Sequence, residues 1–190
     1  MADPHHVPTL DGFDRFTVNL YRAGILTSAG ALLMSGSTHL ILGQDATVLA
    51  PTLWLTIAVG AALAVQNMHL YDKRVRWVIG AAAWVGVVLQ LSGPEFGDGV
   101  LALWVRTAGL GFTFVALSGF ALKEQFCFRI PGLRLVPLIL AGSLIAVLAG
   151  QPMVTGLMHL LAGMIYGALA VAKLRMPLHF DVGDKSRYQI

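Results

Sequence analysis

Long apolar stretches, separated by short polar or turn-forming segments, dominate the chain. A helix that crosses the hydrocarbon core needs about 20 mostly apolar residues, and six stretches approach or reach that length. They cover approximately residues 23–42, 48–70, 76–92, 100–122, 134–150 and 154–172. Because these stretches are continuously apolar instead of alternating, they predict helices and not the strands of a membrane barrel. The pattern therefore predicts an all-α fold with six transmembrane helices joined by short loops.

Composition supports a polytopic membrane protein. Hydrophobic residues make up 56% of the 190 residues and charged residues only 12%, whereas a soluble domain carries about 25% charge. The net charge of +3 is too small to indicate a nucleic-acid partner, so the partner that composition predicts is the lipid bilayer. We therefore expect a single integral membrane domain over residues 1–190, with residues 1–20 and 176–190 as cytoplasmic tails.

The distribution of lysine and arginine predicts the orientation of this bundle. Twelve of the 13 basic residues fall in the N-terminal segment, the second and fourth connections and the C-terminal tail. The first, third and fifth connections contain no lysine or arginine. Because cytoplasmic loops carry the excess of basic residues, both termini are expected in the cytoplasm. The expected location is the bacterial cell (plasma) membrane, or the thylakoid membrane if the source is photosynthetic.

Three ionisable residues lie inside the predicted spans at similar depth near the outer face: His39, Arg106 and His159. Such residues are costly in a bilayer and indicate a functional site by default. Two imidazoles from different helices could ligate a haem iron or a chlorophyll magnesium, and the guanidinium could pair with a carboxylate or phosphate. The structural alternative is that Arg106 reaches the outer surface and pairs with Glu95 or Asp98 while the histidines hydrogen-bond to neighbouring helices. These two interpretations leave open whether the protein binds a cofactor, and whether that cofactor is haem or chlorophyll.

A second polar group is expected at the inner face. His69 and Tyr71 end the second span, and Lys123, Glu124 and Cys127 end the fourth. The sequence has no metal-site spacing such as CxxC or HExxH, and no nucleophile elbow, phosphate loop or paired-carboxylate site. It therefore predicts no metal site and no catalytic residues, and hence a protein that is not an enzyme. If these residues have no functional role, they form part of an interfacial belt, in which aromatic side chains anchor at the lipid headgroups and Lys123 reaches toward the surface.

Small residues inside the spans predict close helix packing. Gly163 and Gly167 form a GxxxG motif in the sixth span. Small residues let helix backbones approach in lipid, where apolar burial gives little drive for association. We expect these two glycines to lie at a helix–helix contact in a compact bundle.

One stretch carries a resemblance to a known family. Residues 111–128 read GFTFVALSGFALKEQFCF, which resembles the block GFTFxALxGxxxKExFCF of an uncharacterised integral membrane family, the domain of unknown function 2301, common in cyanobacteria. The His-x-Tyr at residues 69–71 and the sequence DVGDKS at residues 181–186 also resemble its motifs. The resemblance covers essentially the whole chain and implies no established activity. It implies that the family motifs include Lys123, Glu124, Phe126, Cys127, Phe128, His69, Tyr71, Asp181, Gly183, Asp184 and Lys185.

These motifs suggest a function at the cytoplasmic face. We expect the block 123–128 to dock with the segment 181–186, through Glu124 with Lys185 and through Lys123 with Asp181 or Asp184. The interpretation favoured by the sequence is a non-enzymatic scaffold or assembly partner of a larger membrane complex. The alternatives are a haem- or pigment-binding redox protein and, third, a small transporter, which would need a polar path across the midplane.

Overall fold

The structure, a computed structural model, describes residues 9–70, 72–97 and 99–182. Six main helices follow one another along the chain, with short helical turns between several of them. The main helices are α1 (Gly12–Leu42), α2 (Ala50–Gln66), α3 (Lys73–Ser92), α4 (Val100–Phe128), α5 (Val136–Leu148) and α6 (Pro152–Arg175). The short elements are η1 (Gly43–Val48), η2 (Gly93–Phe96), η3 (Leu133–Leu135) and α7 (His179–Val182). The described residues contain no β-strand, so the expected all-α class is confirmed.

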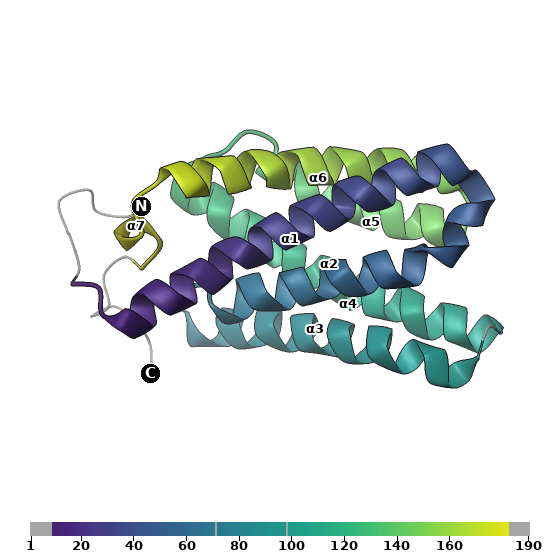
Figure 1. Cartoon of the computed structure of the whole chain (residues 1–190), viewed down its shortest axis with the longest axis horizontal. Helices are drawn as coiled ribbons and strands as arrows, with labels where there is room; N and C mark the ends of the chain where they lie inside the picture. Colours follow the sequence, from purple (N-terminus) through teal and green to yellow (C-terminus); the bar gives the residue numbers. More distant parts are fainter. Residues whose placement is uncertain (1–8, 71, 98, 183–190) are drawn as a thin grey trace.

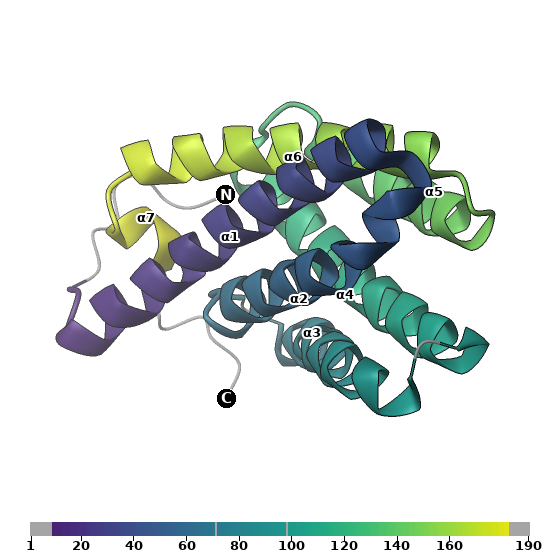
Figure 2. The same ribbon diagram turned by 45° about the vertical axis from the view of Figure 1, so that its right-hand side comes forward.

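The helices form one bundle with two distinct ends (Figure 1). Helix α1 packs against α2 and α6, while α4 contacts α2, α3 and α5. The view turned by 45° shows α1 between α6 and α2, with α3 at the outer edge of the bundle (Figure 2). We call the end that holds the start of α1 and α7 the terminal end. The opposite end, which holds η1, η2 and the α5–α6 connection, is called the far end.

Within the described residues, four helical segments are long and apolar enough to cross a membrane: Gly12–Val48, Lys73–Phe96, Val100–Phe128 and Pro152–Arg175. Two further apolar helical segments, Ala50–Gln66 and Leu133–Leu148, are shorter. The structure therefore supports an integral membrane bundle with four candidate spans, and the count of six remains a proposal. The two shorter segments lie near the lower length limit for spanning a bilayer.

Helix ends differ from the expected span limits where local signals extend the helix. Helix α1 begins at Gly12, well before residue 23, because Asp11 and Asp14 form a reciprocal capping box, which satisfies free N–H groups of the first turn. Helix α4 continues past residue 122 to Phe128 and ends at Arg129, whose φ of 50° is left-handed. The block 123–128 is therefore the last part of a long helix rather than a loop.

Small residues allow close contacts of α1 with its two neighbours. A Cβ at Gly24 would lie 2.3 Å from the backbone nitrogen of Ala64 in α2. A Cβ at Gly36 would lie 2.7 Å from the backbone nitrogen of Leu160 in α6. Larger residues at these positions would force the backbones apart, so small side chains permit this packing.

The two glycines of the GxxxG motif differ in their surroundings. A Cβ at Gly163 would lie 2.9 Å from the backbone nitrogen of Leu33 in α1, whereas a Cβ at Gly167 would meet no atom within 4 Å. The α1–α6 contact therefore uses Gly163, and the open space beside Gly167 leaves room for a side chain.

Candidate functional site

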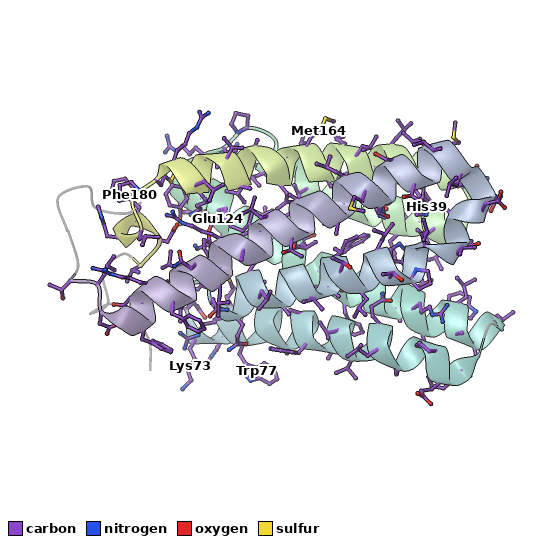
Figure 3. The ribbon with its side chains drawn as sticks, viewed as in Figure 1. His39, Lys73, Trp77, Glu124, Met164 and Phe180 are labelled. Carbon is purple, nitrogen blue, oxygen red and sulfur yellow. The ribbon has the colours of Figure 1, made fainter. Side chains whose placement is uncertain are left out.

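Five charged side chains gather at the terminal end, and Lys173 lies at their centre. Its Nζ lies 2.7 Å from Oε2 of Glu124 and 2.7 Å from Oδ1 of Asp181. Lys173 and Glu124 are fully buried. Lys123 pairs with the other oxygen of Glu124, at 2.5 Å. Figure 3 shows Glu124 inside this end of the bundle. We call Arg22, Lys123, Glu124, Lys173 and Asp181 the charge cluster.

Arg22 connects the cluster to the C-terminal segment. Its Nε and Nη2 both donate to Oδ2 of Asp181, at 2.8 and 2.6 Å. Nη2 also donates to the backbone carbonyls of Met176 and Pro177, at 3.0 and 3.2 Å. One guanidinium of α1 therefore holds both the carboxylate of α7 and the turn that precedes it, which fixes the short α7 against the bundle.

Aromatic rings surround the central lysine. The Nζ of Lys173 lies 3.6 Å from the ring centroid of Phe128 and 5.3 Å from that of Tyr21. The Tyr21 ring also makes an edge contact with Phe120, at a centroid distance of 5.8 Å. Rings attract cations through their negative faces.

The local sequence explains why these charges are buried. Arg22 shares the buried face of α1 with Val18, Ile25 and Ala29, at helical spacings of three and four residues. Lys173 continues the buried stripe of α6 and Glu124 that of α4. Their side chains therefore point into the bundle and meet each other where α4 and α6 end beside α1.

The cluster is suited to holding segments together. Its three cations face two carboxylates, and each charge has an opposite partner within 2.8 Å. Removing one member of a buried ion pair leaves the other charge without compensation, at a cost of about 3–5 kcal/mol. The cluster therefore joins α1, α4, α6 and α7, and removal of any partner should loosen that joint.

At the far end the structure brings two of the three expected site residues together. The rings of His39 and His159 meet edge to face, with centroids 5.8 Å apart. Ser35 lies between them: its Oγ is 2.9 Å from Nδ1 of His159, and its carbonyl oxygen is 2.8 Å from Nδ1 of His39. Figure 3 places His39 at the end of the bundle opposite Glu124. His159 therefore hydrogen-bonds across to α1, whereas the hydrogen bond of His39 stays within its own helix.

Arg106 does not join this pair. It lines a groove that includes neither histidine, and this groove shares Trp54 and Leu103 with the smaller groove beside His39. Within the described residues no ion pair joins Arg106 to Glu95, so that expected pairing is absent. Asp98, the other expected partner, lies outside the described residues.

A tetrapyrrole does not fit between the two histidines. The α1 and α6 backbones are in close contact here, since a Cβ at Gly36 would lie 2.8 Å from the carbonyl oxygen of Gly156. The groove beside His39 has a volume of about 210 Å³, which is below the roughly 300–1,000 Å³ of ligand pockets. This geometry does not support the haem or chlorophyll interpretation.

Comparison with known proteins assigns the chain to a family. A family model described as "Uncharacterized integral membrane protein (DUF2301)" matches residues 62–190. The chain belongs to this family. An uncharacterized protein of Haemophilus influenzae is 32% identical over 191 residues, covering 100% of both chains. No solved structure matches.

The DUF2301 match contains most of the charge cluster, since Lys123, Glu124, Lys173 and Asp181 fall within it. Arg22 lies in α1, outside the matched residues. The expected ion pair of Lys123 with Asp181 is not among the ion pairs of the described residues; Glu124 and Asp181 are instead connected through a third residue. Lys173 joins Glu124 to Asp181, and Arg22 takes the place expected for Lys123.

Sequence reasoning counted Arg22 and Lys173 only as markers of orientation and missed their roles in this DUF2301 protein. Their positions on the buried helical stripes were the signal that could have identified them. The expected pairing of Glu124 with Lys185 lies outside the described residues, as do Tyr71, Gly183 and Asp184.

The remaining motif residues of this DUF2301 chain occupy different surroundings. His69 lines a groove between the starts of α1 and α3 and the end of α2, together with Trp77 and Trp84. Cys127 is a half-buried free thiol. Phe126 has 84% of its surface exposed. The described residues contain no group of three metal-ligating side chains.

Proposed function

We propose that the protein is a non-enzymatic scaffold or assembly partner of a larger membrane complex. The observation that carries this proposal is the charge cluster, which fastens α7 to α1 and to the ends of α4 and α6. A C-terminal segment fixed in this way presents the terminal end as a defined surface, whereas chain ends without such contacts are usually poorly ordered. A partner can then bind that surface without first ordering it.

The last turns of α4 combine the two properties that a docking surface needs. Glu124 faces inward and is fully buried in the cluster, while Phe126, two residues later, is 84% exposed. An exposed aromatic side chain on a rigid support is a typical anchor residue at protein interfaces. The position of Phe126 therefore supports contact with a partner protein at the terminal end.

The test is to replace this anchor without disturbing the bundle. Phe126→Ala should reduce the fraction of the protein that migrates as a larger complex on native gels of mild-detergent extracts. Phe112→Ala is the matched control, because Phe112 is also exposed, at 44%, on the same helix. If both variants leave the complex intact, or if the wild-type protein migrates only as a monomer, the scaffold proposal is wrong.

The proposed topology has six spans, counting the two shorter helices, with both termini in the cytoplasm. It is supported by the placement of twelve of the 13 basic residues in segments expected on that side. A reporter that is active only outside the cytoplasm should be silent when fused after Ile190 and active when fused after Glu95. The reverse pattern would overturn the orientation, in either a plasma or a thylakoid membrane.

A further inference from the structure

A groove of about 510 Å³ opens at the far end between the first turns of α2 and α4. Pro51 and Trp54 line it from α2, and Val100, Leu103 and Arg106 line it from α4. Among the described residues, its lining includes no aspartate or glutamate. The charged and strongly polar groups in this groove are therefore donors.

Two of these donors are buried without an acceptor. Trp54 is 5% exposed, and its Nε1–H has no hydrogen-bond partner among the described residues. The Nε–H of Arg106 is also buried without a partner there. Its side chain passes over Gly93, where a Cβ would lie 2.8 Å from Nε. Buried donors without acceptors are rare in native proteins and call for an explanation, such as a ligand that the groove holds.

Two helix N-termini add further positive potential. Helix α2 begins after Leu49 and α4 begins after Gly99, and neither N-cap residue provides a side-chain hydrogen bond. The first N–H groups of an uncapped helix point outward and carry the positive end of its dipole. Pro51 in the first turn of α2 has no N–H, so α4 provides more of the free donors. Two such ends beside one arginine make a favourable place for an anion.

The remaining lining is apolar and exposed on the side of the bundle. Val48 is 79% exposed, Val100 72% and Leu103 56%. Arg106 lies six residues into α4, about 9 Å along its axis, which is the depth at which headgroups meet acyl chains if α4 spans the bilayer. An occupant of this groove therefore needs an anionic group for the donors and apolar chains for the rim.

We propose that this groove binds the phosphate group of an anionic membrane phospholipid. The phosphate would accept hydrogen bonds from Arg106 and Trp54 at the N-terminal ends of α2 and α4, and the acyl chains would cover the exposed valine and leucine side chains. Arginine presents a planar set of donors that matches phosphate oxygens. This site lies at the opposite end from the surface proposed for the partner protein and does not depend on it.

The experiment measures phosphatidylglycerol binding to the full-length protein in a neutral detergent by native mass spectrometry, with Tm as a second readout. Diacylglycerol with the same chains tests the need for phosphate, and inorganic phosphate tests whether the free anion suffices. Arg106→Gln and Trp54→Phe each remove a donor. The matched controls are Arg74→Gln, an exposed arginine of α3, and Trp104→Phe, an exposed tryptophan next to the groove but not in its lining.

Phosphatidylglycerol should bind and raise the Tm, while diacylglycerol and inorganic phosphate should have little effect. Arg106→Gln should weaken lipid binding about tenfold or more, as expected for the loss of a charge-assisted hydrogen bond. Trp54→Phe should weaken it less, and both controls should bind as the wild type does. Equal weakening by the control variants would overturn the site, and full competition by inorganic phosphate would overturn the lipid as its source.

Asp98 provides the remaining discriminating variant. If its carboxylate fills the groove, the wild-type protein will bind no phosphatidylglycerol, and Asp98→Asn will lower the Tm as much as Arg106→Gln does. That result would replace the proposed lipid site with an internal ion pair. Unchanged or stronger lipid binding by Asp98→Asn supports the lipid site.

Discussion

The two ends of the bundle differ in how their buried cationic side chains are paired. At the terminal end, each charge of the cluster faces an opposite charge, and Arg22 makes two further hydrogen bonds to backbone carbonyls. At the far end, buried nitrogens of Trp54, Arg106 and His159 have no hydrogen-bond partner among the described residues. Both regions lie where helices end, so depth in the bundle does not explain the difference.

This difference separates a structural role from a binding role. Polar groups that satisfy one another rigidify a structure, whereas a buried donor without an acceptor keeps its capacity to bind a ligand. Mutations at the terminal end should therefore act mainly on stability. Mutations of the groove donors at the far end should act mainly on ligand binding, with little cost to the protein without ligand.

The largest effect is expected for Glu124→Gln. Glu124 is fully buried and faces two lysines, so the loss of its charge leaves both cations without their shared partner. We expect the free energy of unfolding to fall by about 3–5 kcal/mol, measured by unfolding in mixed micelles. The matched control is Glu95→Gln, because Glu95 is exposed and should change stability by less than about 0.5 kcal/mol. Similar small values for both variants would show that the cluster does not hold the bundle together.

A smaller and more local effect is expected for Asp181→Asn. The variant weakens the bonds of α7 to Arg22 and Lys173, but this short segment can move away and let water solvate the cations. The expected cost is about 1.5–3 kcal/mol, the range for hydrogen bonds to charged groups. Hydrogen exchange should increase over residues 176–182 and remain unchanged in α2 and α3. Uniform acceleration throughout the bundle would contradict a local role for this contact.

The helical architecture could be predicted from the sequence, because the length of the apolar stretches indicates which segments form helices. Each of the six expected stretches overlaps one main helix, and α4 begins at the expected residue 100. The start of α1 was missed because the apolar run begins later than the helix, and the capping box of Asp11 and Asp14 lies among polar residues. Hydropathy marks the part of a helix suited to lipid, not the turns that extend beyond it.

The charge cluster was only partly accessible from the sequence. Motif resemblance indicated Glu124 and Asp181 and predicted that their segments dock; in the structure Lys173 bridges these two carboxylates. The cations that join them were not identified, because a lysine or arginine at a helix end normally reaches toward the surface. Which of several basic residues turns inward depends on the rotation of each helix in the bundle. That rotation depends on the packing of all six helices. The positions of Arg22 and Lys173 on the buried stripes were the only local sign that these two residues face inward.

At the far end, His159→Phe should have a small effect on stability. The Nε2 atom of His159 has no hydrogen-bond partner within the described part of the chain, so removal of the imidazole loses only the bond to Ser35. The Ser35 hydroxyl can turn toward a backbone carbonyl of the preceding helical turn. We expect a loss of about 0–1 kcal/mol in the same unfolding assay. A loss as large as that of Glu124→Gln would remove the contrast between the two ends.

The last prediction is that an effect is absent. The visible absorption spectrum of the purified protein should contain no haem or chlorophyll band. The reason is steric, because the backbones of α1 and α6 meet beside His39 and His159, where a Cβ at Gly36 would lie 2.8 Å from the carbonyl oxygen of Gly156. Inserting a macrocycle would require these helices to separate and lose their closest contacts. Reconstitution with excess haem, followed by gel filtration, should leave the absorbance of His39→Ala and wild type equally low. A haem band in the wild type that His39→Ala abolishes would show that the histidine pair, and not the lipid groove, is the ligand site of the far end.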